Sequence, residues 1–247
     1  MRLNITASSR LGLVRKNNED MVLVGDWFIR NGKMSAHEDT WAVDRFLLAV
    51  ADGMGGHNSG EVASSDVLHN LQFFFSDLPV GLSISDFNET IYEWLTSINN
   101  IIDSKGQNEE RFSGMGTTLV SLAYYGGEFF WMNCGDSRIY RFHEGRLNQL
   151  STDHSLSNLL GGSTHSSVIT NCIGGGCKSS YIDIVDCTDD VQPGDAFLLC
   201  SDGLTDLLTD KEIEMRMAEG FDADSLCRDA ESAGGYDNVS VIIARVE

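Results

Sequence analysis

The stretch LLAVADGMGGH, residues 47–57, decides the fold class, because an apolar run ends abruptly on an acidic residue followed by glycines. A strand with one solvent-facing side alternates apolar and polar residues. LLAVA has no polar position, which is typical of a strand that is covered on both faces. The stretch AFLLCSDG, residues 196–203, is built in the same way. We therefore expect two buried strands that each end in an Asp-Gly dipeptide, with Asp52 after the first strand and Asp202 after the second.

Two pairs of helices are expected beside these strands. Asn58 and Glu61 have the spacing of a capping box, and apolar residues recur after them at helical spacing. A second helix is expected from about Ser85, and another pair between Asp206 and about Ser232. Helix pairs grouped between strands, without regular βαβ alternation, favour antiparallel sheets with helices on their outer faces. The sequence thus predicts an α+β fold, a four-layer α-β-β-α sandwich of two central, mostly antiparallel sheets flanked by pairs of helices.

Other segments predict further strands. Residues 21–30 are expected to form one strand that turns at Asn31 and Gly32, because both residues tolerate positive φ in a tight hairpin. Four segments are expected to form an antiparallel meander: TTLVSLAYY (117–125), EFFWMNC (128–134), RIYRFH (138–143) and RLNQL (146–150). The last group of expected strands is VITNCI (168–173), SYIDIVD (180–186) and NVSVIIARV (238–246).

Length and composition limit the class of protein. With 247 residues and 42% apolar content, the chain can bury a large core, and no linker divides it, so we expect one domain over residues 1–247. The formal net charge of −20 would repel a nucleic acid backbone. No apolar stretch has the length of a signal peptide or a membrane span, and the six cysteines lack Cys-x-x-Cys spacing. We expect a cytoplasmic, monomeric protein that binds neither nucleic acid nor membrane.

Acidic residues lie at the ends of five expected strands: Glu19 with Asp20, Asp52, Asp136, Asp202 and Asp237. One such end alone most often marks an ordinary turn. If all of them meet at one rim of the sandwich, their repulsion raises their pKa values, and divalent cations would remove the conflict. Carboxylates, a backbone carbonyl and water are ligands that suit Mg²⁺ or Mn²⁺. A pair of these ions can activate water for a displacement at phosphorus, which is the chemistry this pattern indicates.

Arg15 stands four residues before Glu19. Its planar guanidinium group can bind two phosphate oxygens at once. The alternative is an ordinary surface arginine.

Seven motifs, in this order, resemble those of the metal-dependent protein phosphatases of type 2C: GLVRKNNED (12–20), VADGMGGH (50–57), SGMGTTL (113–119), NCGDSRIYR (133–141), TDHS (152–155), CSDGLTD (200–206) and GGYDNVSVI (234–242). The match covers nearly the whole chain. The resemblance implies removal of phosphate from phosphoserine and phosphothreonine in proteins, with substrates phosphorylated by a serine/threonine kinase. It also implies a sandwich fold, two Mn²⁺ or Mg²⁺ ions and a third, weaker ion seen in bacterial members.

The resemblance assigns a role to each matching residue. Asp52 would bridge both ions, the carbonyl of Gly53 would bind one, Asp202 and Asp237 would bind the other, Asp136 with Asp202 would hold the third, Glu19 and Asp20 would act through water, and Arg15 would bind the phosphate.

Three departures from the family pattern affect catalysis and substrate access. Met54 stands where many eukaryotic members have a histidine that is proposed as proton donor, and a thioether cannot donate a proton. A metal-bound water could donate the proton instead. His57 is a second candidate donor, and the alternative is that it caps the helix or has a structural role. The flap, about 156–167, is short, whereas the first hairpin, about 25–45, is long. The cluster His37-Glu38-Asp39 within it is expected to be a solvated hairpin end rather than a cation site.

Other functions remain open alternatives. The glycines in IGGGCKSS, residues 173–180, lack the Gly-Lys pair of a nucleotide-binding loop, so we expect a turn between strands. The short flap and Met54 leave open a weakly active or inactive phosphatase-like module with a binding or regulatory role. A two-metal phosphodiesterase acting on nucleic acid conflicts with the charge of the chain.

Overall fold

The computed structural model describes residues 1–55, 59–161 and 168–247. Two six-stranded sheets form its centre, and every strand pair within them is antiparallel. Sheet A has the order β11 (Arg146–Gln149), β10 (Arg138–His143), β14 (Ala196–Cys200), β15 (Val239–Val246), β1 (Arg2–Arg10) and β4 (Gly32–Asp39). Sheet B has the order β13 (Asp183–Asp186), β9 (Glu128–Cys134), β8 (Leu119–Tyr125), β5 (Arg45–Ala51), β2 (Met21–Val24) and β3 (Trp27–Ile29).

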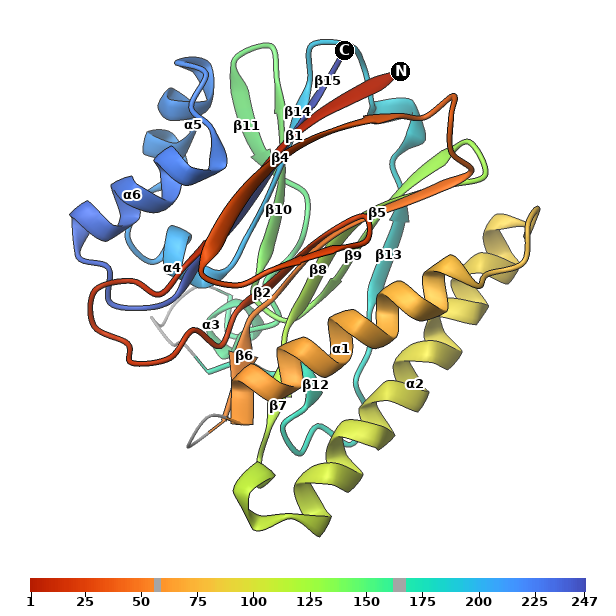
Figure 1. Ribbon diagram of the computed structural model, residues 1–247, viewed down its shortest axis with the longest axis vertical. Helices are drawn as coiled ribbons and strands as arrows, with labels where there is room; N and C mark the ends of the chain where they lie inside the picture. Colours follow the sequence, from red (N-terminus) through yellow and green to blue (C-terminus); the bar gives the residue numbers. More distant parts are fainter. Residues whose placement is uncertain (56–58, 162–167) are drawn as a thin grey trace.

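Helices cover the outer face of each sheet (Figure 1). The helices α1 (Ser59–Ser76) and α2 (Ile84–Asn108) lie against sheet B, and α5 (Asp210–Ala218) and α6 (Ala223–Ala233) lie against sheet A. Short helical segments join these elements: η1 (Glu110–Phe112), α3 (Leu156–Leu159), η2 (Thr188–Asp190) and α4 (Asp202–Thr205). A small third sheet contains β12 (Ile173–Gly174), β7 (Gly116–Thr117) and β6 (Gly53–Met54). The predicted four-layer sandwich is confirmed.

Three apolar layers hold the four layers together. Leu48 and Val50 of β5 pack between the sheets, whereas Leu47, Ala49 and Ala51 face α1 and α2. The expectation that LLAVA is covered on both faces is therefore confirmed. A third apolar layer joins sheet A to α5 and α6.

The helix predictions are close to the observed helices. The side chain of Ser83, two residues before the predicted Ser85, accepts a hydrogen bond from the backbone N–H of Asp86 and caps α2. The predicted helix pair after Asp206 corresponds to α5 and α6. The predicted cap Asn58 lies outside the described residues, and the described part of α1 begins at Ser59. No helix in the described ranges is both long and apolar enough to cross a membrane.

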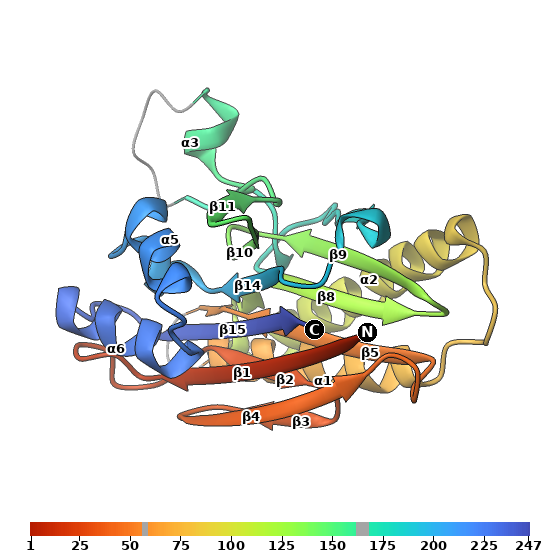
Figure 2. The same cartoon turned by 90° about the horizontal axis from the view of Figure 1, so that it is seen from above.

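Several strand predictions are wrong. Residues 21–30 form two strands, because the chain turns at Gly25, which has a φ of 58°. The Asn31-Gly32 dipeptide does not close a hairpin: it carries the chain from β3 in sheet B to β4 in sheet A. His37–Asp39 consequently belong to an edge strand paired with β1 and not to a hairpin end. The segment 25–45 is long because it supplies an edge strand to each sheet (Figure 2).

The predicted meander is also corrected. The strands β8 and β9 pair in sheet B, and β10 and β11 pair in sheet A, so the chain changes sheets between Cys134 and Arg138. Gly135, in that connection, has a φ of 123°, and a Cβ there would lie 2.7 Å from the side chain of Thr118. VITNCI is mostly irregular, with a single bridge between Ile169 and Ser155 before β12. The glycines 174–176 all have positive φ and form the predicted turn.

Candidate metal centre

The acidic strand ends from both sheets meet at one end of the sandwich. Asp52, after β5, interacts electrostatically with Asp20, Asp202, Asp136 and Asp237. Burial, followed by these four carboxylates, raises the pKa of Asp52 well above its ordinary value. Arg15 interacts with Asp237, Glu19 and Asp52. The fold therefore brings together the acidic residues and the arginine that the sequence singled out.

The backbone around Asp52 is fixed by hydrogen bonds to β7 and its neighbour. The N–H of Asp52 donates to Oγ1 of Thr118 at 3.0 Å, and its carbonyl accepts from the N–H of Thr118 and from Oγ1 of Thr117, each at 2.9 Å. A Cβ on Gly53 would lie 2.1 Å from the carbonyl oxygen of Gly60 and 2.6 Å from that of Glu19. Only glycine fits at this position, because any side chain would overlap the main chain of Gly60 and Glu19.

Asp20 and Asp202 each have one carboxylate oxygen that is buried without a hydrogen-bond partner among the described residues. The other oxygen of Asp20, Oδ2, accepts from Oγ of Ser201 at 2.8 Å. Burial is the main cause that raises the pKa of Asp20 to about 7 and that of Asp202 to about 6. A buried acceptor without a donor is costly unless a cation binds it. These two oxygens are therefore suited to a metal ion or to water bound to one.

Asp237 and Asn238 are joined to a distant segment, the loop at residues 11–19. The N–H of Asn238 donates to Oδ1 of Asp237 at 2.8 Å, and Oδ1 of Asn238 accepts from the N–H of Glu19 at 2.8 Å. Nδ2 of Asn238 donates to the carbonyl oxygens of Leu11 and Asn17 at 2.9 and 3.0 Å. These bonds hold the loop that carries Arg15 and Glu19 beside Asp237.

Arg15 forms an ion pair with Asp237, with 2.5 Å between Nη2 and Oδ2. About half of the Arg15 side chain is exposed, at 51%. Within the described ranges, no group of three His, Cys, Asp or Glu side chains is arranged to hold a metal ion as it stands. Arg15 contacts Oδ2 of Asp237, so the arginine shares this carboxylate with any metal ion that binds there.

Asp136 borders a cavity of about 640 Å³ that opens beside the centre. Burial, followed by the charge of Asp202, raises the pKa of Asp136 to about 7. Asp206, for which no role was predicted, also lines this cavity. Its spacing of four residues from Asp202, which places it directly after α4, was the signal that could have identified it. Arg138 on the same wall is neutralised by two-pronged contact with Asp153, at 2.9 Å from Nε and 2.6 Å from Nη2.

The remaining predictions near this centre have different outcomes. Met54 lies in β6, directly after Gly53. His57 lies outside the described residues, as do residues 162–167 of the predicted flap. The described part of that segment contains α3. Asn238, which the sequence did not identify, has no signal of its own, because its partners are more than 200 residues away in the chain.

Comparisons with known proteins identify the family of this chain. Residues 31–239 match the family described as Protein phosphatase 2C. The serine/threonine protein phosphatase PstP of Mycobacterium tuberculosis is 33% identical in an alignment of 254 positions that covers 99% of this chain and 45% of PstP. This chain therefore spans about half the length of that relative.

Solved structures extend the similarity to the fold. The serine/threonine phosphatase of S. agalactiae aligns with a TM-score of 0.83 at 26% identity, over 99% of this chain and 100% of that one. The catalytic domain of PstP in complex with two manganese ions aligns with a TM-score of 0.73 at 30% identity, over 100% of both chains. Sequence and fold agree, and this chain belongs to the protein phosphatase 2C family.

Proposed function

We propose that residues 1–247 form a single catalytic domain that hydrolyses phosphoserine and phosphothreonine in proteins with the aid of Mn²⁺ or Mg²⁺. The observation that carries the proposal is the convergence of carboxylates from both sheets on Asp52, with buried oxygens of Asp20 and Asp202 left without partners. PstP, whose catalytic domain has been solved with two manganese ions, supports the choice of metal. Both the activity and the metal are consistent with the family.

The residues have separate roles in this proposal. Asp52, Asp202 and Asp237, with the carbonyl of Gly53, would hold a pair of ions, and Asp136 with Asp202 a third. Glu19 and Asp20 would orient metal-bound water. Bound ions of this kind lower the pKa of water and stabilise charge on a phosphoryl group.

Arg15 would bind the phosphate of the substrate. In the structure its guanidinium contacts Asp237, which is an oxyanion at the edge of the same centre. A phosphate offers two oxygens to the same planar group, and a charge-assisted two-pronged contact is stronger than a single one. Substrate binding would thus exchange one anionic partner of Arg15 for another and release Asp237 toward the ions.

The proposal also covers partners and location. Substrates would be proteins phosphorylated by a serine/threonine kinase, and the enzyme would act as a monomer in the cytoplasm. Six free cysteines, of which five are buried, are in keeping with a reducing compartment.

A phosphatase assay tests the proposal. Purified protein is expected to release phosphate from a phosphothreonine peptide when Mn²⁺ is added and to stop when EDTA is added. Asp52→Asn should lower the rate at least about 100-fold, because it removes a charge that stabilises the reacting centre. Asp189→Asn, on an exposed turn, is the matched control and should keep full activity. If fully metal-loaded protein shows no turnover, the chain is a phosphatase-like binding module instead.

A further inference from the structure

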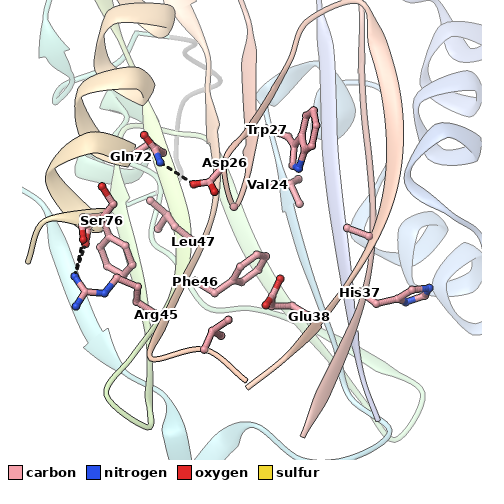
Figure 3. A pocket seen from close by; sticks show the side chains of 14 residues that line it. Val24, Asp26, Trp27, His37, Glu38, Arg45, Phe46, Leu47, Gln72 and Ser76 are labelled. Atoms are coloured by element: carbon pink, nitrogen blue, oxygen red, sulfur yellow. Dashed lines mark hydrogen bonds between the residues drawn. The ribbon is translucent and has the colours of Figure 1, made fainter. Parts of the chain in front are cut away.

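A second cavity, of about 330 Å³, lies at the edge of the sandwich where β3 and β4 are the outermost strands (Figure 3). Its floor is the start of β5, and its walls are the turn between β2 and β3, residues 36–38 of β4 and the end of α1. None of the residues that line it belongs to the candidate metal centre. The cavity is therefore separate from the proposed catalytic site.

Glu38 is an acidic residue at a position that the fold reserves for an apolar one. In β4, Met34, Ala36 and Glu38 pair with Ala7, Ile5 and Leu3, whose side chains pack between the two sheets. Met34 and Ala36 join that apolar layer, but the next inward position carries a carboxylate. Figure 3 shows Glu38 beside Phe46, at the mouth of the layer. A half-buried carboxylate at such a position is costly unless something positive meets it.

Within the described part of the chain, no positively charged side chain pairs with this carboxylate. Among the described residues, no hydrogen bond or ion pair of the Glu38 side chain is found. Arg45, the one arginine that lines the cavity, donates instead to the carbonyl oxygens at the end of α1, from Phe75, Ser76 and Leu78 at 3.1, 3.0 and 2.7 Å. His37 projects from the opposite face of β4, where Nδ1 contacts the side chain of Asn4. The carboxylate of Glu38 is thus available to bind a positively charged ligand.

A second carboxylate faces the same space. Asp26, in the turn between β2 and β3, accepts a hydrogen bond from Nε2 of Gln72 at 2.8 Å through one oxygen only. Burial, then the charges of Asp39 and Asp26, raises the pKa of Glu38. Two carboxylates and one arginine, which is engaged with carbonyl oxygens of α1, thus line the cavity, and a cation placed in it would meet both carboxylates.

The walls of the cavity favour an organic cation over a metal ion. Val24 and Phe46 are apolar, and Trp27 at the rim is 69% exposed. A lysine or arginine side chain has an aliphatic stem that can lie on such walls, and its charge is also attracted to the face of an indole ring. A divalent ion would need more oxygen ligands than two separated carboxylates offer.

We propose that this cavity is a docking site for a basic segment of a partner protein, in which two neighbouring Lys or Arg side chains are received by Asp26 and Glu38. Charge complementarity selects this occupant, because the chain as a whole carries a net charge of −20 and attracts basic surfaces. A nucleic acid would be repelled by the same charge. The site does not depend on phosphatase activity, since it lies apart from the metal centre.

Peptide binding tests this site directly. A fluorescein-labelled peptide Gly-Gly-Lys-Arg-Gly-Gly and its counterpart Gly-Gly-Gln-Gln-Gly-Gly are titrated with the full chain at low salt, and fluorescence anisotropy is followed. The basic peptide should bind at least about tenfold more tightly. Glu38→Gln should reduce its affinity about fivefold, and the double variant Asp26→Asn with Glu38→Gln should remove the preference for the basic peptide.

Two controls separate docking from general charge and from catalysis. Glu89→Gln removes one negative charge from the exposed side of α2 and should leave binding unchanged. Asp52→Asn should bind the peptide as wild type does, whether or not the proposed phosphatase activity is found. Thermal melting checks that each variant is folded. The proposal is overturned if a folded double variant keeps the full preference, or if Glu89→Gln weakens binding as much as Glu38→Gln.

Discussion

Asp20, Asp136 and Asp202 are acids whose burial, reinforced by the charges of nearby carboxylates, raises their pKa values to about 7, about 7 and about 6. The ordinary pKa of such a group is 3.8. The folded chain therefore binds protons at these sites more tightly than the unfolded chain does. The stability contributed by this proton binding is complete below about pH 4 and is lost as the pH rises through 6 to 7.

The metal-free protein should consequently be less stable at pH 8 than at pH 5. Urea unfolding in EDTA is expected to show a lower free energy of unfolding at the higher pH, because all three carboxylates are then charged beside one another. Asp136→Asn removes one of the groups and should make the dependence shallower. A free energy of unfolding that rises from pH 5 to pH 8 would contradict this explanation.

Arg15 should act on substrate and not on folding. Arg15→Ala is expected to lower kcat/KM for a phosphothreonine peptide about 10- to 100-fold, because a charge-assisted contact with phosphate is lost. Arg15→Lys should recover only part of this loss, since an ammonium group cannot make the two-pronged contact. Arg111→Ala, at an exposed arginine of η1, is the control. Equal rates for all of these proteins would show that Arg15 is an ordinary surface residue.

Much of the candidate site follows from local sequence, and the rest depends on distant contacts. Asp52 and Asp202 could be predicted because each directly follows an apolar run. Asn238 could not, because its importance comes from bonds to Glu19 and Asn17 near the other end of the chain. The ion pair between Arg15 and Asp237 likewise joins residues that only the tertiary fold brings together.

The small sheet formed by β6, β7 and β12 is the element that carries Gly53 into the metal centre. Gly53 pairs with Thr117 of β7, and Ile173 of β12 pairs with the same threonine from the other side. Gly60, at the start of α1, packs against Gly53 so closely that a Cβ on Gly60 would lie 2.7 Å from the carbonyl oxygen of Gly53. Glycine at both positions lets helix and strand touch through their backbones.

Gly53→Ala should therefore damage both stability and activity. The added methyl group would overlap the carbonyl oxygens of Gly60 and Glu19, and such overpacking costs about 1–3 kcal/mol. Thermal melting and phosphate release are the measurements. Gly32→Ala is the control, because a Cβ there would meet its nearest atom at an ordinary 3.5 Å. A Gly53→Ala protein with wild-type melting and turnover would rule out the close contact.

At the scale of elements, the sequence predicted the secondary structure of a segment better than the sheet to which a strand belongs. The run LLAVA and the helical periodicity of α2 are local patterns, and they were interpreted correctly. The strand β1 was missed, although Leu3, Ile5 and Ala7 alternate with polar residues, because so few large apolar residues mark it. The Asn31-Gly32 dipeptide determines only the local backbone, so it could not indicate that β4 joins sheet A while β3 joins sheet B.

The molecule as a whole carries 37 acidic and 17 basic side chains. Much of the repulsion is concentrated where strand ends from both sheets meet. Cations that bind there only in the folded state would stabilise the entire sandwich, since binding to the folded state alone opposes unfolding.

Mn²⁺ should accordingly raise the melting temperature. At a concentration 100-fold above the dissociation constant, binding at one site adds about 2.7 kcal/mol to the free energy of unfolding. EDTA should reverse the effect, and Asp202→Asn should remove most of it, whereas Asp189→Asn should not. Differential scanning fluorimetry gives the readout without any substrate. If Mn²⁺ leaves the melting temperature of the wild-type chain unchanged, tight metal binding at this centre is excluded.

The carboxylates of the metal centre belong to different layers: Asp20 and Asp52 flank strands of sheet B, whereas Asp202 and Asp237 flank strands of sheet A. The apolar layer between the two sheets, which includes Val50, thus sets the distance between the carboxylates of sheet A and those of sheet B. A methyl group gained or lost in this apolar layer would change that distance, and with it the turnover rate, although no acidic residue had been substituted. Descendants of one ancestor that share all the same carboxylates would then still drift apart in catalytic speed.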